Sequence, residues 1–303
     1  MRIFIFGAGY SGRAFARRMA GRAEWIAGTT RSADKLDALA RDGMRPVLFD
    51  GAALTDAARA LLAETTHLVV SAGPREGEDP VLAAARETIL CAMPALEWIG
   101  YLSTVGVYGD HDGAWVSEDS ECRPSAQRST ERLKAETGWL DLGRERGVPV
   151  AVLRLSGIYG PGRNALVNLS SGTAKRVIRE GQVFNRIHVA DIAAALEHLG
   201  ARGLGGVYNV TDDRPCPPQD VIAYAASLMG VAPPPEVRFE DAALSPMALS
   251  FWGENKRASN ARIRATGFDF GYPDHETALT RMWREDDWRG EADEVRTTRR
   301  KML

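Results

Sequence analysis

The stretch RIFIFGAGYSG, residues 2–12, decides the fold of this chain. A short apolar run leads straight into a G-x-G-x-x-G pattern formed by Gly7, Gly9 and Gly12, and a helical stretch follows. In such a βα turn the first glycine permits the tight bend, the second lets the main chain approach a pyrophosphate, and the third lets helix and strand pack closely. The pyrophosphate meets unpaired N–H groups and the positive end of the helix dipole. The stretch therefore predicts a dinucleotide-binding site at the first turn of the chain.

Short apolar runs alternate with helical stretches through the first half of the chain, and one more such run follows later. The expected strands cover residues 2–6, 24–28, 45–50, 67–73, 97–104, 149–157 and 205–211. Strands that alternate with helices form right-handed βαβ units, in which the strands are parallel and helices cover both faces of the sheet. The pattern predicts an α/β fold with a Rossmann-type, doubly wound parallel sheet of about seven strands.

The regular alternation of strands and helices stops after the sixth expected strand, and this point divides the chain into two expected parts. Residues 1–160 are expected to form a dinucleotide-binding Rossmann domain, to which residues 188–211 return. Residues 161–187 and 212–280 are expected to form a small substrate-binding lobe, because Pro, Asn and Arg become frequent there. Residues 281–303 are mostly charged and are expected to form a charged tail, either a solvated helix or a frayed end.

The bulk composition excludes several classes of protein. A chain of 303 residues with 45% hydrophobic and 26% charged residues is typical of a globular protein. A net charge of −2 gives no electrostatic reason to expect nucleic acid or an anionic membrane as a partner. We find no signal peptide and no apolar run of the roughly 20 residues that span a bilayer, so a cytoplasmic protein is expected. No metal site is expected, because no metal-like spacing relates Cys91, Cys122 and Cys216.

The end of the second expected strand indicates which dinucleotide binds. A site that prefers NAD offers an Asp or Glu about 20 residues after the glycine pattern, bonded to the ribose diol. Here the strand ends AGTTRS (27–32), with no acid and with Arg31 beside the hydroxyl of Thr30. A carboxylate would repel a 2′-phosphate, whereas an arginine with adjacent hydroxyls would hold one. NADP is therefore favoured over NAD, unless Arg31 is only a solvated loop charge.

Several motifs, taken in their order, resemble one family. They are GAGYSG (7–12), FD (49–50), LSTVGVYGD (102–110), LRLSGIYGPGR (153–163), IHVADIAAAL (187–196) and VYNVTDD (207–213). With them the chain resembles the extended short-chain dehydrogenase/reductase superfamily, specifically its NAD-dependent epimerase/dehydratase group. The glycine spacing and the stretch 255–279 are similar to the atypical members of that group. The resemblance covers nearly the whole length and implies a small-molecule substrate and a homodimer.

The resemblance also implies roles for matching positions. The glycine turn would hold the pyrophosphate, Arg31 the ribose phosphate and Asp50 the adenine edge. The expected cofactor contacts are Gly7, Gly9, Tyr10, Ser11, Gly12, Thr30, Arg31, Asp50, Ala72 and Gly73. Thr104 matches a family Ser/Thr whose hydroxyl bonds the reacting oxygen, and the carboxyl end of a parallel strand is where ligands bind in such sheets. The alternative is that the Thr104 hydroxyl bonds its own turn.

The catalytic pair of this family is missing. The family's tyrosine exchanges a proton with the substrate, and a lysine four residues later, on the same helix face, lowers the tyrosine pKa and holds the ribose. None of the seven tyrosines here has a lysine four residues later. On the helix containing STERLKAE (129–136), one alignment places Thr130 and Lys134 at these two positions. The other, which we prefer because AETGWL then matches the family's helix, places Arg128 and Arg132 there. Neither pair supplies a proton donor at neutral pH, although either alignment provides a cation for the ribose or pyrophosphate.

Three further side chains are candidates for substrate contacts. Tyr108 follows the same strand as Thr104, Arg163 follows a Pro-Gly turn and could bind an anionic group, and His188 titrates near neutral pH. The alternative for Tyr108 and His188 is packing in the interior.

These observations lead to two main hypotheses. In the first, the protein is an NADP-dependent oxidoreductase or epimerase that acts on a small polar or nucleotide-linked substrate. In the second, it is a catalytically inactive NADP-binding sensor or regulatory protein that kept the glycine turn and lost the acid. A flavin-type Rossmann enzyme is disfavoured, because no acid ends the second strand.

Overall fold

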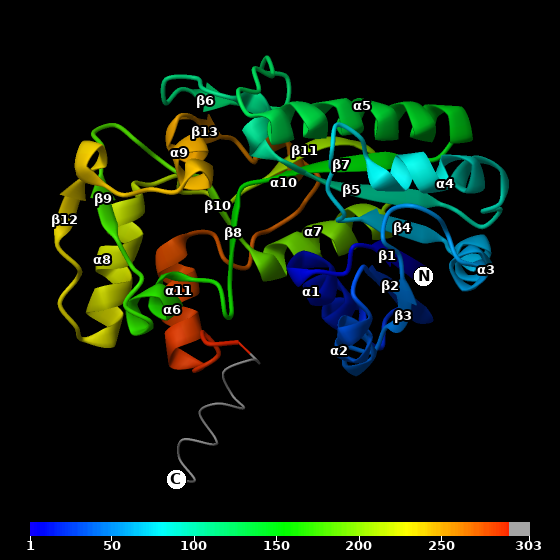
Figure 1. Cartoon of the computed structure of the whole chain (residues 1–303), viewed down its shortest axis with the longest axis horizontal. Coiled ribbons are helices and arrows are strands. Elements are labelled where there is room, and N and C mark those ends of the chain that lie inside the picture. Colours follow the sequence, from blue (N-terminus) through cyan, green and yellow to red (C-terminus); the bar gives the residue numbers. More distant parts are fainter. Residues whose placement is uncertain (291–303) are drawn as a thin grey trace, which may run out of the picture.

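The computed structural model describes residues 1–290, and a seven-stranded parallel sheet forms its centre (Figure 1). The strands lie in the order β11-β7-β5-β4-β1-β2-β3. Their bounds are β1 (Arg2–Phe6), β2 (Trp25–Thr30), β3 (Arg45–Leu48), β4 (His67–Val70), β5 (Trp98–Thr104), β7 (Val150–Leu155) and β11 (Gly206–Val210). The predicted Rossmann-type sheet is confirmed. Its order reverses between β1 and β4, which opens a crevice at their carboxyl ends.

Helices cover both faces of this sheet because its strands are apolar on both sides. On β1, Ile3 and Ile5 enter one core, whereas Phe4 and Phe6 enter the other. The first face carries α1 (Tyr10–Met19), α2 (Leu36–Arg41) and α7 (Val189–Ala201). The second face carries α3 (Asp56–Glu64), α4 (Pro80–Cys91) and α5 (Gln127–Arg146).

Local sequence sets the start of α4 and the end of α5. Asp79 caps α4 by accepting hydrogen bonds from the amides of Val81 and Leu82. Its other carboxylate oxygen accepts one from Trp139 Nε1 at 3.1 Å and so ties α4 to α5. Gly147 ends α5 in the left-handed conformation that favours glycine, with φ of 75°.

A smaller lobe lies beside the sheet, at the left of Figure 1. Its elements are α6 (Ala165–Ser170), β9 (Arg176–Ile178), α8 (Pro218–Met229), β12 (Glu236–Arg238), a short 3₁₀ turn (Phe239–Asp241), α9 (Pro246–Trp252) and α11 (His275–Arg284). Leu166, Ala225, Met282 and Trp288 belong to a separate core within it. Of the predicted charged tail, residues 281–284 belong to α11, and Trp288 after it is buried instead of solvated. Residues 291–303 of that prediction lie outside the described residues.

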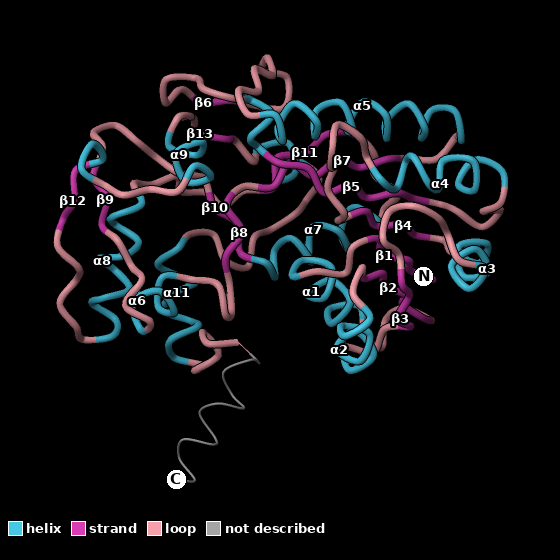
Figure 2. Tube along the Cα trace, viewed as in Figure 1, coloured by secondary structure: helices cyan, strands magenta, loops and turns pink. Residues whose placement is uncertain are grey.

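Two short strand pairs connect the sheet to the lobe (Figure 2). They join β8 (Gly157–Tyr159) to β10 (Arg186–His188) and β6 (Trp115–Val116) to β13 (Arg257–Ala258). The segment after β13 differs from the prediction that placed it in the lobe: Ile263 of α10 (Ala261–Ala265), Phe268 and Phe270 pack into the core of the main sheet. No helix within residues 1–290 combines the length and the apolar character needed to cross a membrane.

Candidate functional site

The glycine turn is fixed by the two strands beside β1. Gly7 has φ of +80°, and a Cβ there would lie 2.7 Å from the main-chain nitrogen of Ala72, so only glycine fits between this turn and the segment after β4. Thr29 of β2 accepts a hydrogen bond from the Gly7 amide at 2.8 Å through its hydroxyl. Its carbonyl accepts another from the Ala8 amide at 2.9 Å.

The next two glycines play different parts. A Cβ at Gly12 would lie 3.2 Å from Ile5 Cγ2, so this glycine lets α1 pack closely on β1. A Cβ at Gly9, the N-cap of α1, would meet nothing nearer than the Gly7 carbonyl oxygen at 4.0 Å. The space over Gly9 is therefore open. The first turn of α1 carries no acidic side chain, so its free amides and the helix dipole favour an anion there.

A cavity of about 220 Å³ lies at the carboxyl ends of β4, β5 and β7, beside the start of α1. It is lined by Ser11, Ser71, Leu102, Ser103, Thr104, Arg132, Leu155, Ser156 and Ile158. The polar groups that the described part of the chain places in it are hydroxyls and one guanidinium, with no carboxylate. Ligands of open α/β sheets bind in this kind of crevice.

Arg132 of α5 is the only cation that residues 1–290 contribute to this lining. Its guanidinium donates hydrogen bonds to the Leu102 carbonyl and, at 3.3 Å, to the Tyr101 hydroxyl. It also lies against Gly73, where any Cβ would collide with it. Gly73 therefore leaves room for the arginine, and the prediction that it contacts the cofactor directly stays a prediction.

The preferred alignment of α5 agrees with this geometry, and the other does not. Lys134 and Thr130 are exposed, and the Thr130 hydroxyl donates to the Ala126 carbonyl at 3.4 Å. Neither lines the cavity. The expectation of a catalytic Lys134 is thus corrected, because residues 132 and 134 of one helix lie on nearly opposite faces.

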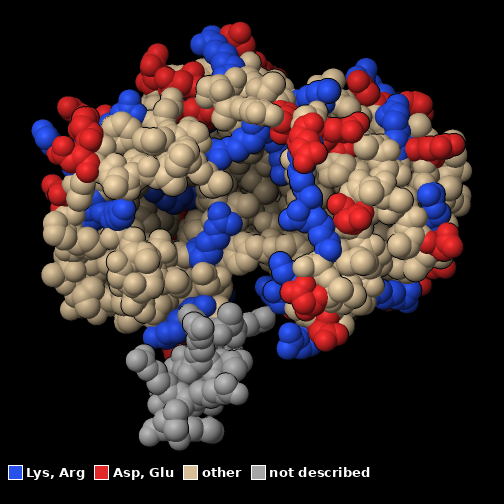
Figure 3. All heavy atoms as spheres, in the orientation of Figure 1, with Lys and Arg blue, Asp and Glu red and all other residues tan. Residues whose placement is uncertain are grey.

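Arg128 lies outside the cavity and bridges the two lobes. It donates to Ser250 Oγ of α9 at 2.9 Å, and its guanidinium carbon lies 4.2 Å from the centre of the Phe251 ring. Figure 3 shows a hollow between the lobes with Lys and Arg side chains on its walls. A role for Arg128 at the reacting atoms stays a prediction.

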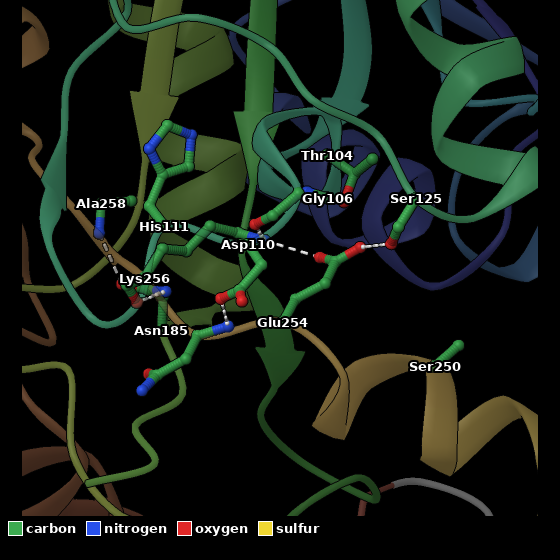
Figure 4. Close-up of polar contacts among 12 residues, drawn as sticks. Thr104, Gly106, Asp110, His111, Ser125, Asn185, Ser250, Glu254, Lys256 and Ala258 are labelled. Carbon is green, nitrogen blue, oxygen red and sulfur yellow. Dashed lines mark hydrogen bonds and ion pairs between the residues drawn. The ribbon is translucent and has the colours of Figure 1, made fainter.

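Thr104 bonds its own turn, as its alternative interpretation states, and its role at the reacting oxygen stays a prediction. Its hydroxyl oxygen lines the cavity and accepts a hydrogen bond from the Gly106 amide at 3.0 Å (Figure 4). The hydroxyl hydrogen is left for another acceptor. Gly109 lies in the loop that follows Thr104. Lys256, from the segment after α9, donates to the Gly109 carbonyl at 2.7 Å and to the Glu254 carboxylate at 2.6 Å, and so ties this loop to the smaller lobe.

Tyr108 is a core residue, which corrects its prediction as a substrate contact. Its side chain is fully buried. Its hydroxyl donates to Asn209 Oδ1 at 2.7 Å and accepts from Arg154 Nη1 at 3.0 Å, so its hydrogen-bonding capacity is used within the protein. Burial raises the pKa of Tyr108 to about 12.

His188 is also buried, at 2% exposure, and its Nε2 has no hydrogen-bond partner among residues 1–290, so its role as a substrate contact stays a prediction. Its Nδ1 accepts a hydrogen bond from the Ala190 amide and caps α7. Its ring stacks on Tyr272 with centroids 3.7 Å apart. Burial, assisted by the charge of Arg281, lowers the pKa of His188 to about 4.

We expect His188→Asn to flatten the acid side of the stability profile. The folded state disfavours protonation of His188, so its contribution is present above pH 6.5 and is lost as the pH falls toward 4. Between pH 7 and pH 5 this loss amounts to about 2 kcal/mol in the native protein. Asparagine can cap the helix without titrating. Urea unfolding at both pH values should show a smaller change for the variant.

Burial also raises the pKa of Asp191 to about 6, so this group acts in the opposite direction in both proteins and cancels from the comparison. An equal loss of stability in native protein and variant would show that His188 does not cause the acid sensitivity.

The predicted adenosine contacts lie after β2 and β3, on the same edge as the glycine turn. Arg31 is exposed and forms no salt bridge with any residue of 1–290. The Thr30 hydroxyl accepts from the Ser32 amide at 3.3 Å. Asp50 is exposed and accepts from the Ala52 amide at 2.9 Å. The exposed Arg163 lies apart from them, in a turn closed by two main-chain bonds with Gly160.

The cavity lacks the side chains that commonly serve as general acids or bases. Among residues 1–290, its lining holds no His, Asp, Glu, Cys, Lys or Tyr. Elsewhere, burial raises the pKa of six tyrosines, namely Tyr10, Tyr101, Tyr108, Tyr159, Tyr208 and Tyr272. A catalytic tyrosine needs the opposite shift.

Three hydroxyls of this cavity were not predicted from the sequence. Ser71 follows β4 directly, Ser103 lies near the end of β5, and Ser156 follows β7 directly. The signal that singled out Thr104, a hydroxyl at the carboxyl end of a parallel strand, applies to all three.

Comparisons with known proteins show the family of this chain and agree with its Rossmann-type fold. Residues 3–211 match the model of the NAD dependent epimerase/dehydratase family. Protein YeeZ of Escherichia coli K12 is 27% identical over 289 residues, which cover 90% of this chain and 97% of YeeZ. A solved structure of a functionally unknown conserved protein from Silicibacter pomeroyi is 43% identical, with a TM-score of 0.85, and covers 94% of this chain and 99% of its own. A dTDP-glucose 4,6-dehydratase from Bacillus anthracis, solved in complex with NAD, is 18% identical with a TM-score of 0.74, over 95% of this chain and 97% of its own. That last likeness shows the fold alone.

Proposed function

Because the chain belongs to the NAD-dependent epimerase/dehydratase family, we propose that it binds NADP and acts as an oxidoreductase or epimerase on a small polar or nucleotide-linked substrate. The observation that carries the proposal is the open glycine turn. The space over Gly9 suits a pyrophosphate, and Ser11 of the same helix lines the neighbouring cavity. A nicotinamide dinucleotide therefore fits the residues present.

The side chains of the cavity suggest how they would serve such a reaction. The bound nicotinamide supplies the hydride chemistry. The free hydrogen of the Thr104 hydroxyl can polarise a substrate oxygen, and the fixed positive charge of Arg132 stabilises negative charge that develops nearby. Because arginine stays protonated, a water molecule or a group of the substrate has to exchange the proton.

The same lining supports the second candidate function, a catalytically inactive NADP-binding sensor. The specific observation is that residues 1–290 contribute no His, Asp, Glu, Cys, Lys or Tyr to the cavity. Both candidates require cofactor binding, and only the enzyme requires transfer of hydrogen.

Two measurements test these candidates in order. Fluorescence titration with NADPH measures the binding that both require. Incubation with NADPH deuterated at C4 and a panel of carbonyl compounds, followed by mass spectrometry, measures transfer. Binding without transfer to any compound favours the sensor, and absence of binding contradicts both.

We expect Arg31→Glu to reverse the cofactor preference toward NAD. The change removes a cation that can hold the 2′-phosphate and adds a charge that repels it. The loss of a charge-assisted contact of about 1.5–3 kcal/mol corresponds to roughly 10–100-fold weaker NADPH binding. Calorimetric titration of NADPH and NADH checks the ratio.

Arg41→Glu is the matched control, because it makes the same charge change at an exposed position of α2. An equal shift in both variants would show that Arg31 acts only through the overall charge.

A further inference from the structure

Ser156 has a buried hydroxyl that no other group of residues 1–290 uses. It follows β7 directly and is 6% exposed. Its Oγ has no hydrogen-bond partner among residues 1–290, although it belongs to a residue that lines the cavity. Leaving a buried hydroxyl unpaired costs about 1–3 kcal/mol, so such a group calls for a partner from outside the protein chain.

The position of Ser156 in the sheet tells which part of a dinucleotide would reach it. The strand order places β7 two strands from β4 and three from β1. At about 4.8 Å per strand, Ser156 lies roughly 14 Å from the glycine turn across the sheet. A ligand whose pyrophosphate lies over Gly9 would therefore meet Ser156 with the end that points away from the adenosine, which is the nicotinamide.

The neighbours of Ser156 indicate the chemistry of the group that binds. Leu155 and Ile158 present apolar walls suited to a flat ring, and Leu102 adds a third. Within residues 1–290 the lining contains no carboxylate, and its only charge, Arg132, is already bonded to the Leu102 carbonyl and the Tyr101 hydroxyl. A serine hydroxyl both donates and accepts, as a neutral amide does.

We propose that the Ser156 hydroxyl hydrogen-bonds the carboxamide of the nicotinamide and thereby sets the orientation of the ring in the cavity. Ser156 is thus a positioning residue for the reaction. This inference rests on the proposed function, because it requires a bound nicotinamide dinucleotide.

The test compares two ligands that share the adenosine end. Ser156→Ala should weaken NADPH binding by about 3–10-fold, the effect of one lost neutral hydrogen bond. It should leave the affinity for 2′,5′-ADP, which has no nicotinamide, unchanged. Removal of an unpaired buried hydroxyl should not lower the melting temperature of the free protein. Ser227→Ala, at an exposed position of α8 whose hydroxyl bonds the Tyr224 carbonyl, is the control and should change neither affinity.

The outcomes separate this inference from the function on which it rests. If the native protein binds neither ligand, the proposed function fails. If it binds both and Ser156→Ala binds NADPH equally well, the inference is overturned. A loss of equal size for both ligands also overturns it, because it shows a structural effect or a contact elsewhere on the cofactor.

Discussion

Replacing Gly9 by Asp is expected to abolish NADPH binding, with a loss of at least about 100-fold in affinity. The substituted side chain enters the space that the pyrophosphate requires. It also places a carboxylate against the diphosphate, and two like charges 4 Å apart repel by about 4 kcal/mol near a protein surface. Calorimetric or fluorescence titration with NADPH measures the loss.

The free protein should tolerate this change, which makes the test specific. Apart from its two chain neighbours, no atom of residues 1–290 would lie nearer than 4.0 Å to a Cβ at Gly9, and φ of −82° is open to any residue. Gly9→Asn has nearly the same volume without the charge, so it should bind more weakly than the native protein and better than Gly9→Asp. Native affinity in Gly9→Asp, with an unchanged melting temperature, would mean that the pyrophosphate does not lie at this turn.

The parallel sheet and the glycine turn were predictable because their signals are local. Gly7, Gly9 and Gly12 follow an apolar strand within one short stretch, and each position depends on neighbours close in sequence or on the strands adjacent to β1. The alternation of strands and helices then restricts the topology to a few arrangements.

The burial of Tyr108 and His188 was not predictable in this way, because it comes from contacts distant in the sequence. Tyr108 bonds Asn209, a residue of β11 about a hundred positions later. His188 stacks on Tyr272 from the segment before α11. A motif places such a residue near a strand end, but packing decides whether its side chain faces the cavity or the core.

The rotation of α5 about its axis is the third feature that the sequence left open. An alignment shifted by two residues exchanges Arg132 for Lys134 and turns the opposite face of the helix toward the sheet. The structure selects Arg132 because Ala135, Glu136 and Trp139 are buried on the sheet side. Glu136 is the polar member of this buried set, and it finds its partner on β7.

Replacing Glu136 by Ala is expected to lower the free energy of unfolding by about 3–5 kcal/mol, because it leaves the Arg154 guanidinium buried without a counter-ion. The two side chains are 3% and 6% exposed, and Arg154 Nη2 lies 2.8 Å from Glu136 Oε2. Burial opposes charge on Arg154, but the hydrogen bonds and charge of Glu136 outweigh it and raise the arginine pKa. At roughly 2–4 °C per kcal/mol, the melting temperature should fall by about 6–20 °C.

Two controls separate the ion pair from the helix that carries it. Glu131→Ala, at a position of α5 where the carboxylate only accepts a hydrogen bond from the exposed Gln127, should change stability by less than about 0.5 kcal/mol. The double variant Glu136→Met, Arg154→Met removes both charges and should recover at least half of the loss, because uncompensated charge causes most of it. If Glu136→Ala unfolds at the same urea concentration as the native protein, the pair does not hold α5 to β7. If it unfolds at a lower urea concentration, NADPH affinity should fall as well. Glu136 lies one helical turn from Arg132, and its ion pair fixes the rotation of α5 that directs Arg132 toward the cavity.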